Sequence, residues 1–158
     1  DLGSHKEISQ SLCQKYNLDS KDILIDESYV EIWAKILNCY FVSSLTDSDK
    51  KFQHFCTMMA IEKEFSLYQA TKVKQFIKSS KDKNLDRDTN VSAYYLVVGE
   101  MFSELNKFLT ICGSDPYLRD EQRCLEYIYH LDGLKKRKVN KSDTFYNTMR
   151  MSITELEL

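Results

Sequence analysis

The chain contains very few residues that interrupt helices. Beyond its first five residues it has only three glycines and one proline: Gly99, Gly113, Gly133 and Pro116. Glycine and proline are the residues least tolerated inside a helix, because glycine costs backbone entropy and proline removes a hydrogen-bond donor. The apolar residues recur mostly at spacings of three and four, the period of an amphipathic helix. The sequence therefore predicts an all-α fold, a compact bundle of six to seven helices.

The size of the chain fits one domain. A chain of 158 residues with 42% hydrophobic and 29% charged residues buries a real core and keeps a polar surface. The net charge of −2 excludes a broadly basic surface for nucleic acid. Residues 1–5, Asp-Leu-Gly-Ser-His, resemble the remnant of a cleaved tag. We expect residues 6–158 to form a single helical domain of a larger protein.

The clearest helix is expected over 27–45, preceded by Asp26 as a candidate N-cap. One wide stripe, in which Trp33 is expected to face the core, is formed by Tyr29, Trp33, Ile36, Leu37, Tyr40, Phe41, Ser44 and Leu45. Other helices are expected over 6–16, 50–78, 91–112, 116–132 and from about 143 onward. Segment 50–78 reads equally as one helix or as two that meet at Ser66. Thr46 and Asp49 have the spacing of a capping box before it, and residues 79–90 are polar and predict a mobile loop.

The helix expected over 91–112 is apolar nearly all round in its first half, which predicts a central, buried position. Gly99 lies inside it. Because a glycine in a helix costs about 1 kcal/mol relative to alanine, the close approach of another helix is the expected compensation.

No pattern in the sequence indicates catalysis. Glycine-rich phosphate loops, nucleophile elbows and zinc-protease helices are all absent from the sequence. Glu62 and Glu64 are two residues apart and diverge on a helix, whereas Glu100 and Glu104 share a face on which we expect both to be solvated. The sequence therefore predicts a non-enzymatic protein without a cofactor.

The five cysteines are widely spaced, and an odd number of such residues favours reduced thiols in an intracellular protein. Cys112, Cys124 and His130 come nearest to a set of metal ligands. They lack the paired spacing with which cysteine and histidine chelate zinc, so no metal is expected. No apolar run approaches the roughly 20 residues of a membrane helix, and no membrane partner is expected.

A basic run follows Gly133 and contains Lys135, Lys136, Arg137, Lys138 and Lys141. Its four contiguous cations resemble a monopartite nuclear localisation signal, which an import receptor binds as an extended peptide. Two alternatives remain open. The run 135–141 fits a patch that binds phosphates, and it also fits a solvated cluster near the carboxyl end of a helix.

Ten tyrosines occur in the chain, and several gather in its second half. Tyrosine offers a large contact area with a polar tip, which suits binding surfaces as well as ordinary packing at the edge of a core. The candidate partner surface consists of Tyr94, Tyr95, Tyr117, Tyr127 and Tyr129.

These patterns together favour a non-catalytic protein–protein interaction or scaffold domain from a larger intracellular protein, with the nucleus as the location that the basic run suggests. The alternative is a nucleic-acid-binding helical domain that uses residues 135–141. The alternative predicts an affinity that falls with salt concentration.

Overall fold

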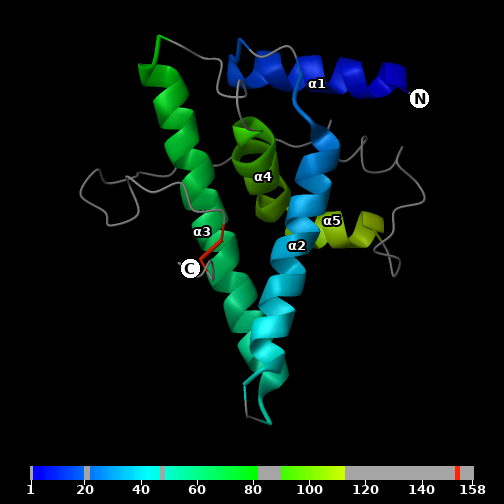
Figure 1. Ribbon diagram of the computed structural model, residues 1–158, viewed down its shortest axis with the longest axis vertical. Coiled ribbons are helices and arrows are strands. Elements are labelled where there is room, and N and C mark those ends of the chain that lie inside the picture. The colour runs from blue at the N-terminus through cyan, green and yellow to red at the C-terminus, as the bar shows by residue number, and fades with distance from the viewer. Residues whose placement is uncertain (1, 20–21, 47–48, 82–89, 113–151, 154–158) are drawn as a thin grey trace.

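The structure is a computed structural model made of helices (Figure 1). It describes residues 2–19, 22–46, 49–81, 90–112 and 152–153, and no strand occurs among them. The elements are α1 (Leu2–Tyr16), α2 (Ile25–Ser44), α3 (Lys51–Ser79), a π-helical turn η1 (Ser92–Val97), α4 (Val98–Ser103) and α5 (Leu105–Cys112). The predicted all-α class is confirmed for this part of the chain. The helix expected over 116–132 lies outside the described residues.

Helices α2 and α3 form a long hairpin. They converge at their connecting turn and splay apart at the other end, where α4 lies between them (Figure 1). Helix α1 crosses the splayed end, and α5 leaves α4 in a new direction (Figure 1). The hairpin therefore has a wide end that holds other helices and a narrow tip.

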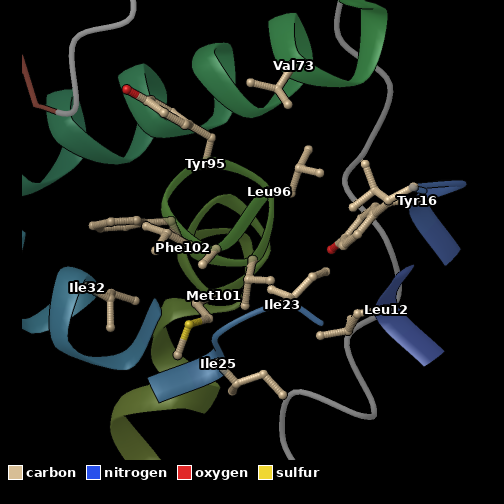
Figure 2. Close-up of a cluster of buried hydrophobic side chains, with 14 of the residues drawn as sticks. Leu12, Tyr16, Ile23, Ile25, Ile32, Val73, Tyr95, Leu96, Met101 and Phe102 are labelled. Atoms are coloured by element: carbon tan, nitrogen blue, oxygen red, sulfur yellow. The ribbon is translucent and has the colours of Figure 1, made fainter. Parts of the chain in front are cut away.

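The hydrophobic core fills the wide end of the hairpin. Side chains from α1, α2, α3, η1 and α4 meet there (Figure 2), among them Leu12, Tyr16, Ile25, Ile32, Val73, Leu96, Met101 and Phe102. The part of the hairpin that runs from Ile36 of α2 through the connecting turn to Val73 of α3 adds no buried residue to this cluster between those two. In that part, only the partly buried side chains of Phe55 and Met59 pack against the cluster. The tip of the hairpin thus stands outside the main core.

Segment 50–78 proves to be a single helix, and α3 runs without a break through Ser66. The predicted caps beside the hairpin are wrong. Helix α2 begins at Ile25 with Leu24 at the N-cap, so Asp26 lies in its first turn. Lys50 is the N-cap of α3, while the Thr46 hydroxyl donates to the carbonyl of Ser43 at 2.7 Å.

The expected helix over 91–112 is divided. It starts as the π-helical turn η1, continues as α4 and bends at Glu104, where φ is −113° and ψ is 35°. The bend brings Phe108 of α5 to α2, where its ring centroid lies 5.9 Å from that of Trp33 and 6.0 Å from that of Tyr29. Packing of this aromatic cluster, rather than a glycine or a proline, therefore accompanies the break. Gly99 is buried in α4, between α2 and α3.

The two ends of the chain differ from the sequence-based expectations. Helix α1 begins at Leu2, so residues assigned to a tag remnant are helical. Ser152 and Ile153 are not helical, although a helix was expected from about 143 onward. Helix α3 ends at Ser79, where the polar loop 79–90 was predicted to start, and residues 82–89 of that loop lie outside the description.

Candidate functional site

Helix α2 is apolar on two opposite faces. Its inner face carries Ile25, Ile32, Ile36 and Cys39, all buried. Its outer face, here called the outer α2 face, consists of Val30, Ala34, Leu37, Phe41 and the C-cap residue Leu45. Spacings of four, three, four and four residues keep these side chains in line along a helix.

The outer α2 face is exposed. Val30 is 63% exposed, Leu37 48%, Phe41 59% and Leu45 86%. The sequence stripe predicted for 27–45 grouped Leu37, Phe41 and Leu45 with the core, and that grouping is wrong. The core-facing side of α2 is the opposite one, which Ile32 and Cys39 occupy.

No charged side chain interrupts this part of the helix. The ten residues from Ile36 to Leu45 include no Asp, Glu, Lys or Arg. A helix on a protein surface normally presents charged and polar side chains to water. A contiguous apolar strip on the outside is the usual mark of an interaction site.

Aromatic rings extend the apolar surface around the tip of the hairpin. The ring of Tyr40, 54% exposed, lies 5.7 Å from that of Phe41 and 6.3 Å from that of Phe55, measured between centroids. Phe52, at the start of α3, is 77% exposed. These rings bring the aromatic residues that most often dominate protein interfaces to one end of the molecule.

A cavity of about 240 Å³ lies at the same tip, between the end of α2 and the start of α3. It is lined by Val42, Ser43, Thr46, His54, Thr57 and Met58. Inside it, the Thr46 hydroxyl oxygen lies 3.1 Å from Nδ1 of His54. The surface of the cavity is mostly apolar, and its polar groups are the His54 imidazole and the hydroxyl groups of Ser43, Thr46 and Thr57.

A buried carboxylate joins the two helices of the hairpin. The side chain of Glu62 on α3 is 0% exposed, and its Oε1 lies 3.0 Å from Nζ of Lys35 on α2. Ser66 donates to the same oxygen at 3.3 Å. The pair links α2 to α3, and removal of either partner would leave the other charge buried and unpaired.

A second buried carboxylate joins α1, α3 and α4. Oε2 of Glu100, a side chain only 1% exposed, lies 2.7 Å from Nζ of Lys15, and its Oε1 lies 3.7 Å from Nζ of Lys74. The expectation that Glu100 and Glu104 are both solvated is therefore wrong for Glu100. Cations from two distant helices compensate its burial, and no local pattern could reveal them.

Burial and the two carboxylates shift the pKa values of the ionisable groups beside them. Burial, followed by the negative charge of Glu100, raises the pKa of Tyr16 well above its ordinary value. Burial, followed by the charge of Glu62, raises the pKa of the Cys39 thiol to about 11. Burial lowers the pKa of Lys74, although the nearby Glu100 opposes this effect. The Cys39 thiol is thus a poor nucleophile at neutral pH, since the thiolate is the reactive form.

None of the described cysteines, Cys13, Cys39, Cys56 and Cys112, forms a disulfide bond. Among the described residues, no group of three or more His, Cys, Asp or Glu side chains is placed to hold a metal ion. Cys124 and His130 lie outside them. Within the same limits, no helix combines the length and the apolar character needed to cross a bilayer.

The residues that the sequence analysis named as candidate contacts for a partner do not form one surface among the described residues. Tyr95 is buried in the core, as Figure 2 shows. Tyr94 is partly buried, and its hydroxyl donates to Oε2 of Glu27 at 3.1 Å. The other residues named for partners lie outside the described residues: Tyr117, Tyr127, Tyr129, Lys135, Lys136, Arg137, Lys138 and Lys141. The outer α2 face was missed, although the uncharged run from Ile36 to Leu45 was visible in the sequence.

Comparison of the chain with protein-family models, with curated proteins and with solved structures gives no significant match. The function must therefore be argued from the residues themselves.

Proposed function

We propose that this chain is a non-catalytic protein–protein interaction domain that binds an apolar helix of a partner protein along the outer α2 face. The observation that carries the proposal is an exposed stripe from Val30 to Leu45 on a helix whose opposite side already packs on the core. Water contact with this much apolar surface is unfavourable by roughly 25 cal/mol per Å².

The size of the surface supports a stable complex. The exposed parts of the aromatic residues Tyr40, Phe41 and Phe52 amount to roughly 300–500 Å², if an aromatic side chain offers about 150–250 Å², and the exposed parts of Val30, Leu37 and Leu45 add to this area. A typical specific interface buries about 800 Å² on each partner. The patch therefore has nearly the area that one side of such an interface requires.

The shape and charge of the surface define the partner. From Val30 to Leu45 the stripe is about 22 Å long, which matches four turns of a helix. Because its last ten residues, from Ile36 to Leu45, carry no charge, that part of the stripe offers no counter-ion to an acidic or a basic peptide. An amphipathic helix with leucine, phenylalanine or methionine along one side is the partner that fits.

Replacement of Phe41 by Asp tests the proposal. A buried charge at the centre of an apolar interface costs more than about 2 kcal/mol, so Phe41→Asp should lower partner binding by at least about thirtyfold. Phe76→Asp is the matched control, since Phe76 lies on α3 towards the wide end of the hairpin and is 54% exposed. Folding should be unchanged in both variants, because both side chains already face solvent.

The measurement is quantitative affinity capture from cell extract after nuclease treatment, with mass spectrometry of what is retained. A partner that binds the parent chain and Phe76→Asp, but not Phe41→Asp, supports the proposal. Its affinity is then measured with purified proteins. Equal retention of every partner by both variants contradicts the proposal.

The basic run 135–141 supports a separate proposal about location. Its contiguous cations favour recognition by an import receptor and hence a nuclear scaffold, with phosphate binding as the alternative use of the same charges. We also propose that segments 116–132 and 143–151 contribute helices, which would complete a bundle of six to seven.

A further inference from the structure

The C-terminal residues Ser152 and Ile153 contact the buried carboxylate of Glu62. The Ser152 hydroxyl donates to Oε2 of Glu62 at 2.8 Å, and the backbone N–H of Ile153 donates to the same oxygen at 3.0 Å. In Figure 1 these residues, drawn in red, lie across α3 about halfway along its length. A stretch of chain 90 residues away in sequence is thus held by one side chain of α3.

The two carboxylate oxygens of Glu62 accept hydrogen bonds from different parts of the chain. Oε1 receives the donors of the hairpin itself, Lys35 at 3.0 Å and Ser66 at 3.3 Å. Oε2 receives the donors of the C-terminal residues. Hydrogen bonds to a carboxylate are stronger than those between neutral groups.

The backbone at this point departs from the helix that the sequence predicts. The sequence around Ser152 and Ile153 has helical spacing, with Met149, Ile153 and Leu156 expected on one face. The structure instead has an irregular residue and a turn. The amide of Ile153 donates to the Glu62 carboxylate, so this side chain of α3 satisfies the backbone donor at a residue that is not helical.

We propose that Glu62 forms a peptide-binding site for a hydroxyl-bearing residue followed by a residue that offers a backbone N–H, and that Ser152 and Ile153 of this chain occupy the site in cis. The hydroxyl and the next backbone N–H converge on Oε2, whereas Lys35 holds the charge of the carboxylate in place. The site lies on α3 and does not depend on the outer α2 face.

The experiment empties the site and refills it with a peptide. In the full-length chain, Ser152→Ala removes the hydroxyl and Ile153→Pro removes the N–H. A fluorescent peptide of residues 148–158 is then titrated into the double variant and into the parent chain. The control peptide carries the same two substitutions.

The proposal predicts that the native peptide binds the double variant at least tenfold more tightly than the control peptide does. The parent chain should bind neither peptide, because its own segment competes at an effective concentration in the millimolar range. Equal binding of the two peptides, no binding to the double variant, or equal binding of the native peptide to both chains overturns the proposal.

A measurement on the parent chain is independent of how well the double variant folds. The Ile153 amide should exchange its hydrogen at least tenfold more slowly than the same amide in the isolated peptide, because it donates to a buried carboxylate. An Ile153 amide that exchanges as fast as in the isolated peptide likewise overturns the proposal.

Discussion

Replacement of Lys35 by Met is predicted to destabilise the domain severely. The Lys35 side chain is 4% exposed, and its Nζ lies 3.0 Å from Glu62 and 3.8 Å from Glu31. Methionine fills a similar volume but leaves the Glu62 carboxylate without its cation in a site that is 0% exposed. Loss of one partner of a buried pair costs about 3–5 kcal/mol.

This cost is a large part of the total stability of a single domain, about 5–15 kcal/mol. At roughly 2–4 °C per kcal/mol for a chain of this size, the melting temperature should fall by about 6–20 °C. The assay is thermal and urea unfolding followed by circular dichroism. Lys78→Met serves as the control, since Lys78 is an exposed lysine on α3, and it should cost less than about 0.5 kcal/mol.

A double-mutant cycle separates the ion pair from simple loss of packing. When Glu62 is replaced by Leu in the Lys35→Met background, no carboxylate is left unpaired, so the two changes together should cost at least about 2 kcal/mol less than their sum. A cost for Lys35→Met no larger than that of Lys78→Met, or strict additivity in the cycle, would refute the reasoning about the hairpin.

Three further predictions concern other parts of the chain. Gly99→Leu should destabilise by about 1–3 kcal/mol in urea unfolding, because Gly99 is buried in α4 between two helices; an unchanged or higher melting temperature would contradict that packing. The folded-state pKa of Cys39 is raised from 9.0 to about 11, so the protonated thiol contributes stability that is complete below pH 9 and lost between pH 9 and 11. The free energy of unfolding of the parent chain should therefore fall by about 2–3 kcal/mol more over this pH range than that of Cys39→Ala. The same pH profile in both proteins would argue against this role of Cys39. Simultaneous replacement of Lys136, Arg137 and Lys138 by Ala should leave thermal unfolding unchanged and abolish nuclear accumulation of a reporter fusion; normal localisation would exclude the import signal, and weaker nucleic-acid binding at low salt would instead favour the phosphate-binding alternative.

The helices themselves could be predicted from the sequence because their signals are local. The spacing of apolar residues located α1, α2 and α3, and the scarcity of glycine and proline indicated their length. The break at Glu104 could not be foreseen, because the aromatic contact of Phe108 with Trp33 that accompanies it joins segments 75 residues apart in the numbering.

The candidate site was only partly predictable. Periodicity shows that α2 is apolar, but it cannot tell which of two apolar sides faces the core, so Phe41 was assigned to the wrong one. Charge pairing between distant helices is invisible in one sequence, and for that reason Glu100 was expected in solvent and Glu62 was given no role. The absence of charge between Ile36 and Leu45 was the available signal.

The most direct test of the central claim is photo-crosslinking at the outer α2 face. The photoreactive residue benzoylphenylalanine replaces Phe41 in one chain and Phe76 in another, and both are irradiated in cells that express the protein. The account predicts a discrete crosslink to a partner protein from position 41, mapped by mass spectrometry to an apolar helix of that partner, and none from position 76. No crosslink from position 41, or the same products from both positions, would contradict it.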